Sequence, residues 1–313
     1  MKVLVTGVFG FIGSHFAEML VKEGGCRVVG FDRNTDQKNK LRISSATRNY
    51  IHYVHGDLAG DISGLVEDID IVVHFAAKTF VDHSIKDPSA FVRSNIIGTY
   101  NLLEQCRLYK PKLYIQVSTD EVYGAILEGS YKEDAPLNPT NPYSATKAAG
   151  DMLALSYHNT YGLNTIVTRT ENNYGKFQHP QKVFPNFTNK ALIGEPLPVY
   201  GDGQHARMWL RVEDHCSAIC LLMDKGQPGE IYHVAGEEEL KNLDLAKKIL
   251  RILDRPEDQY ELIPDHDIRP GHDKRYALDS SKIKALGWTP KYDLDGGIEE
   301  VVKWYRDNDW WLR

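Results

Sequence analysis

The stretch KVLVTGVFGFIGS, residues 2–14, decides the fold of this chain. It opens with an apolar run, Lys2–Thr6, and continues through glycines spaced as G-x-x-G-x-x-G into a helical pattern, Ser14–Lys22. A buried strand, a glycine-rich turn and a helix in this order are typical of the first unit of a doubly wound parallel sheet. We therefore expect strands and helices to alternate along the chain.

Five more apolar runs follow, rich in Val and Ile and with little alternation of polar and apolar residues. Such runs indicate parallel strands that are covered on both faces. They are Arg27–Asp32, Tyr50–His55, Ile69–Phe75, Leu113–Ser118 and Asn164–Thr168. Helical patterns lie between them, most clearly Pro88–Leu108 and Tyr143–Tyr161. The sequence thus predicts an α/β fold, a Rossmann-type doubly wound parallel sheet whose ligands bind at the C-terminal edge of the strands.

The 313 residues of the chain are enough for about two domains. We expect the sheet domain over residues 1–170, with elements near 207–235 returning to it, and a smaller mixed α/β lobe over residues 171–313. Two strand–helix units are predicted in the second half: Val199–Gly203 into Val212–Met223, and Ile231–Ala235 into Leu243–Leu253. A last helix, Ile298–Trp311, is expected to dock Trp304 and Trp310.

The composition excludes several classes of protein. Lys plus Arg is 37 and Asp plus Glu is 43, so the net charge is −6 and nucleic-acid binding is not expected. No run approaches ~18 apolar residues, so neither a membrane-spanning helix nor a membrane partner is expected. The four cysteines match no zinc or redox spacing. We therefore expect free thiols, no metal site and a cytoplasmic protein.

The glycine-rich turn is a candidate pyrophosphate site. Gly7 permits the tight turn, Gly10 lets the backbone approach a phosphate, and Gly13 lets the helix pack on the sheet. The helix N-terminus adds unpaired N–H groups and a positive dipole end. Asp32 ends the second strand, where a carboxylate accepts hydrogen bonds from ribose hydroxyls and repels a 2′-phosphate. The pattern favours NAD over NADP, although Arg33 follows directly.

A second group of residues is suited to acid–base chemistry. Tyr143 and Lys147 lie four apart on one predicted helix, so they share a face. The ammonium, together with a nicotinamide cation, is expected to favour the Tyr143 phenolate as a base. Thr119, Asp120 and Glu121 follow the fifth predicted strand directly. Like charge is expected to raise the pKa of one acid, which gives a protonated acid beside an ionised base. A turn with two solvated acids is the alternative.

Together, these residues resemble the motifs of a known protein family. The chain resembles the extended short-chain dehydrogenase/reductases and, within them, the nucleotide-sugar 4,6-dehydratases, with the Thr119-Asp120-Glu121 triplet as the most diagnostic feature. One departure from the family pattern is Glu171, where a small residue is usual. The matching segments run nearly end to end: Thr6–Ser14, His74–Ala77, Val81–Ile85, Asn95–Glu104, Ser118–Gly124, Tyr143–Asp151, Asn172–Gly175, Trp209–His215 and Arg269–Tyr276.

The resemblance implies that the chain dehydrates a nucleotide-activated glucose with bound NAD, and dTDP-glucose is favoured over UDP-glucose. Tyr143, assisted by Thr119 and Lys147, takes the 4-hydroxyl proton while C4 is oxidised. Glu121 then removes the acidified C5 proton, and Asp120 protonates the departing 6-hydroxyl. Hydride returns to C6, and the product is a 4-keto-6-deoxy sugar.

The resemblance also implies binding residues and a homodimer built on the two long helices. The cofactor residues are Gly7, Gly10, Phe11, Ile12, Gly13, Asp32, Arg33, Asn34, Asp57, Leu58, Phe75, Ala76, Ala77, Ser94, Tyr143, Lys147 and Asn173. The substrate residues are Thr79, Thr119, Asn172, Lys182, Val183, Pro198, Val199, Tyr200, Arg207, Asn242, Arg269 and His272. The lobe over 171–313 is accordingly expected to bind mainly the nucleotide sugar.

Two alternatives stay open. A nucleotide-sugar 4-epimerase or decarboxylase resembles the chain as well, but it needs no acid pair, so its activity would survive the loss of Glu121. A catalytically silent NAD-binding regulator is disfavoured, because Tyr143, Lys147 and Thr119 are all present.

Overall fold

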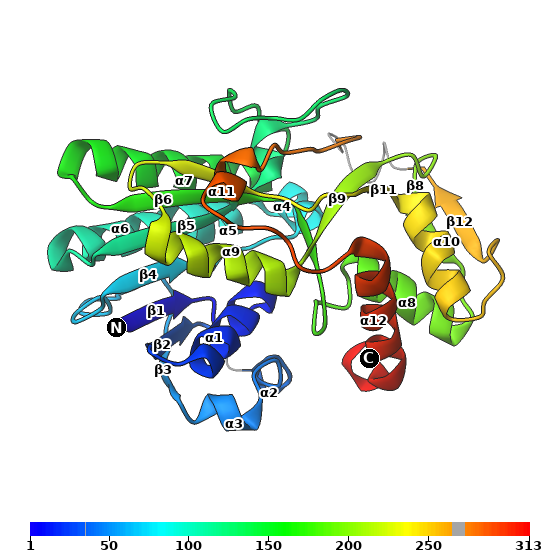
Figure 1. Ribbon diagram of the computed structural model, residues 1–313, viewed down its shortest axis with the longest axis horizontal. Helices are drawn as coiled ribbons and strands as arrows, with labels where there is room; N and C mark the ends of the chain where they lie inside the picture. Colours follow the sequence, from blue (N-terminus) through cyan, green and yellow to red (C-terminus); the bar gives the residue numbers. More distant parts are fainter. Residues whose placement is uncertain (35, 265–272) are drawn as a thin grey trace.

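Seven parallel strands form the central sheet of the protein (Figure 1), in a computed structural model that describes residues 1–34, 36–264 and 273–313. The strand order is β10-β6-β5-β4-β1-β2-β3, and each neighbouring pair is parallel. The strands are β1 (Lys2–Thr6), β2 (Arg27–Asp32), β3 (Ile51–His55), β4 (Ile71–His74), β5 (Leu113–Thr119), β6 (Thr165–Thr170) and β10 (Ile231–Val234). The predicted doubly wound parallel sheet is confirmed.

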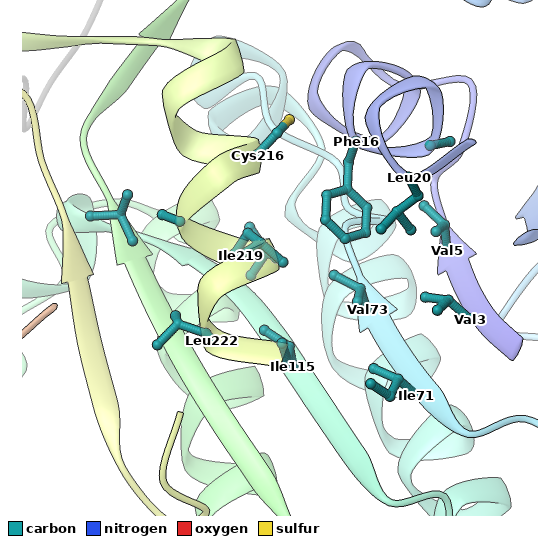
Figure 2. Close-up of a cluster of buried hydrophobic side chains, with 14 of the residues drawn as sticks. Val3, Val5, Phe16, Leu20, Ile71, Val73, Ile115, Cys216, Ile219 and Leu222 are labelled. Atoms are coloured by element: carbon teal, nitrogen blue, oxygen red, sulfur yellow. The ribbon is translucent and has the colours of Figure 1, made fainter. Parts of the chain in front are cut away.

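Different helices cover the two faces of the sheet. Alternate strand residues point to opposite faces, so Val3 and Val5 pack with α1 and α9, whereas Leu4 packs with α6 and α7. Figure 2 shows the first layer, in which Phe16 and Ile219 lie over the strands. The four helices are α1 (Phe11–Glu23), α6 (Gly98–Tyr109), α7 (Pro142–Tyr161) and α9 (Val212–Lys225).

The predicted helix Pro88–Leu108 is helical throughout but is not α-helical along its whole length. A π-helical segment, η1 (Val92–Ile97), separates α5 (Pro88–Phe91) from α6. Asn95 in η1 accepts a hydrogen bond from Lys78 N (2.8 Å) and donates to Lys78 O (3.1 Å) and Thr146 Oγ1 (3.0 Å). The widened turn therefore anchors the loop after β4, as π-helical insertions often do near functional sites.

The remaining short elements of the first half lie at the sheet's edges and in its loops. They are α2 (Gln37–Lys40), α3 (Ser45–Arg48), α4 (Val81–Lys86) and η2 (Asp120–Tyr123). Thr119 accepts a hydrogen bond from Glu121 N (3.3 Å) and so caps η2 at the end of β5. This cap turns the chain sharply, so that Asp120 and Glu121 stand at the C-terminal edge of the sheet.

The second half forms a lobe with its own core and two small sheets. One sheet has the order β11-β9-β7, and the other pairs β12 with β8. The strands are β7 (Asn172–Tyr174), β8 (Leu197–Tyr200), β9 (Ala206–Arg211), β11 (Glu239–Lys241) and β12 (Tyr260–Ile263). The helices of the lobe are α8 (Val183–Ile193), α10 (Asn242–Ile252), α12 (Leu294–Asp307) and the 3₁₀ turn η3 (Asp309–Trp311). Helix α11 (Ser281–Ala285) instead contacts β10 and places Ile283 in the core of the central sheet.

The strand–helix units predicted for this half are wrong in detail. The strand directly before α9 is β9, whereas Val199–Gly203 falls partly in β8, on the other small sheet. β11 similarly stands between β10 and α10. The sequence of β9 does not read as an apolar strand, because it carries two buried arginines, Arg207 and Arg211. Each guanidinium is bound by carbonyl or carboxylate oxygens that lie far away in the sequence.

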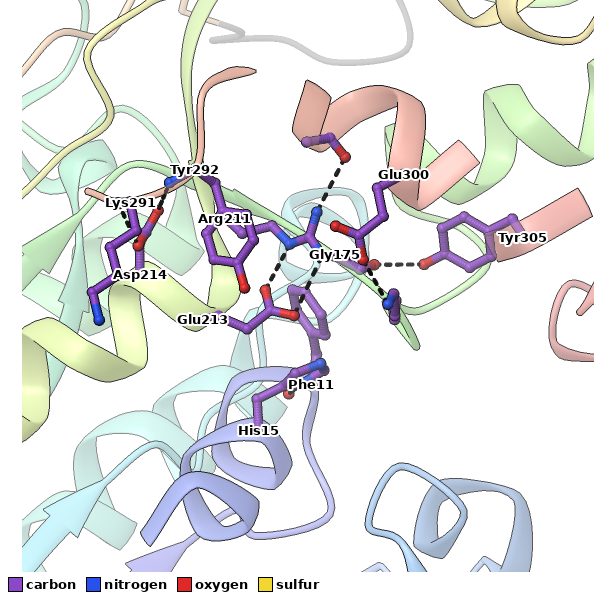
Figure 3. A network of polar contacts seen from close by, with 12 residues as sticks. Phe11, His15, Gly175, Arg211, Glu213, Asp214, Lys291, Tyr292, Glu300 and Tyr305 are labelled. Atoms are coloured by element: carbon purple, nitrogen blue, oxygen red, sulfur yellow. Dashed lines mark hydrogen bonds and ion pairs between the residues drawn. The ribbon is translucent and has the colours of Figure 1, made fainter. Parts of the chain in front are cut away.

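A polar network around Arg211 joins the sheet layer to the C-terminal helix (Figure 3). Its guanidinium donates to Glu213 on α9 (2.7 Å), to Gly297 O on α12 (3.1 Å) and to Glu300 on α12 (3.1 Å). Tyr305 adds a bond to Gly175 O (2.9 Å), just after β7. The lobe is thus held to α9 by buried polar contacts as well as by packing.

The end of the chain returns to the body of the protein through Trp311, not through Trp310 as predicted. Trp311 is 1% exposed and donates from Nε1 to Gln178 O (2.7 Å), whereas Trp310 is 44% exposed. Trp304 is docked as expected, with its ring 4.5 Å from that of Phe177. Trp310 and Trp311 lie in the 3₁₀ turn η3, after the end of α12, so they do not continue the α-helix that was predicted to Trp311. Among the described residues, none of the helices has the length and apolar character that a bilayer span requires.

Candidate active site

A cleft of about 650 Å³ runs along the C-terminal edge of the sheet. The loops that follow β1 to β6 all contribute to its wall, as expected of a doubly wound sheet. The lobe supplies the facing side with residues 178–180, Lys182 and Trp311. Every predicted catalytic residue and every predicted cofactor residue lines this cleft.

The glycine turn leaves no room for side chains. A Cβ at Gly7, where φ is +70°, would lie 2.9 Å from the backbone of Ala76. A Cβ at Gly10 or Gly13 would lie 2.9 or 2.3 Å from Gly7 O. Helix α1 starts at Phe11 without a side-chain cap, so its first N–H groups stay open to the cleft. The geometry fits a backbone cradle for a phosphate group.

Asp32 stands at the end of β2, on the cleft wall. Its carboxylate accepts from Phe9 N (2.9 Å) and Asn34 N (2.8 Å), while burial raises its pKa above the usual value. Asp57 follows β3, accepts from Ala59 N (3.0 Å) and lies 3.6 Å from the Arg93 guanidinium. The two carboxylates mark the ends of neighbouring strands, where a dinucleotide's ribose and base are bound in this fold.

Tyr143 and Lys147 enter the cleft from the first two turns of α7. The helix begins with a capping box in which Asn141 Oδ1 accepts from Ser144 N (3.0 Å), and the N–H of Tyr143 is satisfied by Ser84 Oγ (3.2 Å). Lys147 Nζ donates to Val117 O on β5 (2.7 Å). The cap and these two bonds fix the Tyr143 and Lys147 side chains against the strand that carries the acids.

The acids stand next to Tyr143. Thr119 Oγ1 donates to Asp120 Oδ1 (3.0 Å) and is also hydrogen-bonded to the Tyr143 side chain. Burial, reinforced by the charge of Glu121, raises the pKa of Asp120 to about 7. Burial raises the pKa of Glu121 as well, but the charges of Lys182 and Arg207 oppose that rise. Asp120 is therefore the member that holds a proton near neutral pH.

In the protein without ligands, Lys147 alone does not produce the expected phenolate at Tyr143. Burial and the nearby charge of Glu121 raise the pKa of Tyr143 rather than lower it. Burial also lowers the pKa of Lys147 to about 8. The ammonium is directed at Val117 O, so it does not offset the cost of burying a phenolate. Tyr143 is consequently a neutral phenol in the protein without ligands.

The predicted substrate residues divide into two groups. Thr79, Thr119, Asn172 and Lys182 line the cleft, where Lys182 Nζ donates to Thr79 O (3.1 Å) and lies 4.5 Å from the Phe80 ring. Val183, Pro198, Val199, Tyr200, Arg207 and Asn242 lie outside the cleft wall as described, and Val199 is fully buried in the core of the lobe. Arg269 and His272 lie outside the described residues.

Arg207 does not line the cleft, but its charge influences the acids in it. Its guanidinium donates to Ala206 O (2.8 Å), Lys274 O (3.0 Å) and Asp273 O (2.8 Å), and it lies 4.5 Å from the Tyr276 ring. Its charge lowers the pKa values of both Asp120 and Glu121. The structure therefore connects this predicted residue with the acid pair, although Arg207 does not line the cleft.

Sequence reasoning missed part of the wall. The lining residues that were not predicted are Phe9, Phe31, Asp36, Lys38, Asn39, Arg42, Gly56, Phe80, Val117, Ser118, Thr170, Glu171, Gln178, His179, Pro180 and Trp311. Val117, Ser118, Thr170 and Glu171 lie at strand ends or next to predicted residues, so position along a strand could have found them. Arg42 and Trp311 belong to no motif, and only the fold brings them 4.8 Å apart at the cleft.

Known proteins match this chain closely. The family described as GDP-mannose 4,6 dehydratase matches residues 4–301. A dTDP-glucose 4,6-dehydratase of Streptomyces niveus is 44% identical over 324 residues, which cover 99% of this chain and 95% of that protein. The motif-based resemblance is thereby confirmed.

Solved structures agree with these matches. DesIV, a dTDP-glucose 4,6-dehydratase from Streptomyces venezuelae crystallised with NAD bound, has a TM-score of 0.94 and 40% identity, and the match covers 100% of this chain and 99% of that chain. A UDP-glucuronic acid 4-epimerase from Bacillus cereus has a TM-score of 0.93 and 30% identity, covering 98% and 100%. A dehydratase and a 4-epimerase thus share this fold, so the activity has to be argued from the residues of the site.

Proposed function

Since the chain belongs to the family described as GDP-mannose 4,6 dehydratase, we propose that it dehydrates a nucleotide-activated glucose to the 4-keto-6-deoxy sugar, with NAD as cofactor and dTDP-glucose as substrate. The observation that carries the proposal is the acid pair Asp120 and Glu121, which shares one buried cleft with Tyr143. An elimination needs an acid and a base in addition to the group that takes the 4-hydroxyl proton, whereas oxidation and reduction at C4 need only that one group.

The cleft residues fit a nicotinamide dinucleotide. Side chains are excluded at Gly7, Gly10 and Gly13, which leaves backbone N–H groups for the pyrophosphate. Asp32 suits ribose hydroxyls and repels a 2′-phosphate, which favours NAD. When bound, the oxidised cofactor supplies a hydride acceptor and a positive charge in the cleft, and its reduced form returns the hydride.

Each acid–base residue has a defined task in this reaction. The positive charge of the bound oxidised cofactor would favour the phenolate of Tyr143. This group, hydrogen-bonded to Thr119, then accepts the proton of the sugar 4-hydroxyl as C4 becomes a ketone. The ketone acidifies the C5 proton, which Glu121 removes. Asp120, whose pKa of about 7 keeps a proton available, protonates the leaving 6-hydroxyl so that it departs as water. Lys147 holds α7 against β5 through Val117 O.

We assign the two regions of the chain different ligands. Residues 1–170, with β10 and α9, would bind the cofactor, and residues 171–313 would bind mainly the nucleotide sugar. Lys182 and Asn172 belong to the second of these regions and lie on the cleft wall, which supports this division. The sequence also predicts a cytoplasmic protein, and the four cysteines are free thiols, which suits a reducing compartment.

We further propose a homodimer built on η1, α6 and α7. Large apolar side chains are exposed on these elements: Val92, Ile97, Tyr100, Leu108, Met152 and Tyr161. Leu103 and Tyr157 are instead buried within the chain. Exposed apolar area of this kind is typical of interfaces. Light scattering behind size exclusion tests the proposal, and a monomer at every concentration would contradict it.

A 4-epimerase is the second candidate, because a 4-epimerase shares the fold. The test is to incubate the purified protein, without added cofactor, with dTDP-glucose and separately with UDP-glucose. Loss of one water by mass spectrometry, with the alkaline absorbance of a 4-keto product, is expected and would be faster with dTDP-glucose. A product of unchanged mass with inverted C4 would replace the proposal by epimerisation.

The matched variant Glu121→Gln sharpens this test. Dehydration should fall by on the order of 10²-fold or more, because the C5 base is lost, whereas an epimerase would keep its rate. A thymidine and a uridine substrate differ by one methyl group, so the base preference is expected to stay within about 200-fold.

A further inference from the structure

A short segment of the lobe, residues 177–182, crosses the cleft between β7 and α8 and is called the strap here. Its first residue, Phe177, has a φ of +64°, in the left-handed region that bulky side chains rarely adopt. Such a conformation persists only where the surroundings hold it. The contacts of the strap therefore decide its position. The strap residues that line the cleft are Gln178, His179, Pro180 and Lys182.

Arg42 joins the first end of the strap to the glycine turn. It lies between α2 and α3, is 8% exposed and lines the cleft. Its guanidinium donates to Phe9 O in the glycine turn (2.6 Å) and to Phe177 O in the strap (3.1 Å). No carboxylate of the described residues lies within ion-pair distance of it. One buried cation thus connects the two sides of the cleft beside the phosphate cradle.

Trp311 covers this connection from the turn η3. Its ring lies 4.8 Å from the Arg42 guanidinium and 5.3 Å from the Phe177 ring. Its Nε1 donates to Gln178 O in the strap (2.7 Å). Lys38 Nζ lies 5.3 Å from the same ring, so α2 contacts Trp311 as well. Trp311 therefore holds Arg42 and the strap together.

The other end of the strap contacts the loop that follows β4. Lys182 Nζ donates to Thr79 O (3.1 Å), and the ring of His179 lies 5.0 Å from that of Phe80. The strap consequently spans the cleft from the glycine turn to the loop after β4. These are the two places on the sheet side where the cofactor residues are concentrated.

We propose that Arg42 and Trp311 form a latch, which holds the strap closed over the bound dinucleotide and sets the rate at which NAD leaves. The inference rests on the proposed cofactor and is independent of the identity of the sugar. The strap has to lift before NAD can pass, which breaks the contacts of Arg42 with Phe177 and of Trp311 with Gln178. Arg42 and Trp311 are positioning residues, since they act through the strap.

The charge of Arg42 links the latch to the cofactor. A buried guanidinium that is bound by neutral oxygens alone is costly. A pyrophosphate on the glycine turn, of which Phe9 is part, would supply the opposite charge. Bound cofactor therefore favours the closed strap, and by linkage the closed strap favours retention of the cofactor.

Retention suits the proposed dehydration. The hydride taken from C4 has to return to C6 of the same sugar, so the reduced cofactor must stay in the cleft between the two transfers. An epimerisation through a 4-keto sugar has the same need. The latch is therefore compatible with either reaction of the bound sugar.

The experiment measures how fast radiolabelled NAD leaves the loaded protein when excess unlabelled NAD is added. Release should be about fivefold faster in Trp311→Phe, which loses the bond to Gln178 O, and at least about tenfold faster in Arg42→Met, which loses both carbonyl bonds. Trp310→Phe makes the same change at the exposed neighbour and should release NAD at the wild-type rate. Trp311→Phe is the milder change and decides: release at the wild-type rate would overturn the latch.

The rate of NAD uptake distinguishes a latch from a lost binding contact. Uptake by protein stripped of its cofactor should also be faster in Trp311→Phe, because the strap has to lift for passage in either direction. Faster release with unchanged or slower uptake would overturn the latch. A wild-type protein that binds no NAD would overturn the cofactor assignment and the latch together. Both expected rate changes, without dehydration of dTDP-glucose, would support the latch and contradict only the proposed reaction.

Discussion

The two sides of the cleft are built by different rules. On the sheet side, the glycine turn and the acids follow strands, and Tyr143 and Lys147 lie on α7, so their places are set by local sequence and by the parallel topology. On the lobe side, the groups depend on buried polar residues such as Arg207 and Arg211, each of which has partners more than 60 residues away as well as near ones. The first side is set mainly by the order of strands, and the second by long-range contacts.

Because of this difference, the residues assigned to the reaction and the contacts that hold the lobe in place lie on different sides of the cleft. The acids, Tyr143 and the glycine turn all belong to the sheet side, which places them by regular structure. The lobe contributes Lys182 and Trp311 to the wall and the charge of Arg207 behind it. Changes on the sheet side should therefore affect the rate of the reaction, whereas changes in the lobe's polar network should affect stability first.

The largest expected effect lies on the sheet side. Tyr143→Phe removes the group that accepts the 4-hydroxyl proton, so kcat should fall on the order of 10³-fold. The melting temperature should stay close to that of the wild type, because the ring and its contact with Phe91 (6.4 Å) remain. Tyr157→Phe on the same helix, outside the cleft, is the matched control and should keep its rate. A variant at Tyr143 with more than a tenth of the wild-type kcat would contradict the assignment.

The same difference explains what the sequence could predict. Six of the seven strands of the central sheet were found among the uniform apolar runs, and the acids and most cofactor residues came with them, because their positions follow from strand ends. Tyr143 and Lys147 were found from their spacing on one helix instead. β9 was missed because two buried arginines break its apolar pattern. Trp311 and Arg42 could not be placed, since their contact joins residues 42 and 311 and no local pattern reports it.

Glu171 lies between these two cases. Its position at the end of β6 is visible in the sequence, and it stands out as a departure from the family pattern. Its burial beside Asp120 is visible only in the fold, because it depends on the pairing of Thr119 with Thr170 and on Leu278 N. The sequence alone therefore predicts where Glu171 lies along the strand, but its protonation state depends on contacts that only the fold shows.

The next effect tests whether the two regions unfold together. Ile115 in the sheet core and Ile249 in the lobe core are both fully buried, so each change to Ala should cost about 2–5 kcal/mol of unfolding free energy. A single unfolding transition is expected for both variants, since β10 and the Arg211 network join the regions. Calorimetry checks this. A separate early transition in Ile249→Ala alone would mean that the lobe unfolds independently.

A smaller effect concerns pH. Burial raises the pKa of Asp120 to about 7 in the folded protein, above the usual value of about 4. Stability that depends on the neutral acid is therefore present below about pH 4 and is lost as the pH rises to about 7. Asp120→Asn is neutral throughout, so it should raise the melting temperature at pH 8 by a few degrees and change it little at pH 4. An equal shift at both pH values would contradict the buried charge.

The smallest effect probes the joint between the regions. Arg211→Met removes the cation that binds Glu213 and Glu300, and both carboxylates are partly exposed and can be solvated again. The cost should therefore be about 1–2 kcal/mol, less than for a fully buried pair, while kcat stays within about twofold. Lys303→Met, which breaks an exposed pair with Glu299 on the same helix, should cost less than about 0.5 kcal/mol. If Arg211→Met lowered kcat tenfold at unchanged stability, the lobe would influence the chemistry directly, and the contrast between the two sides of the cleft would fail.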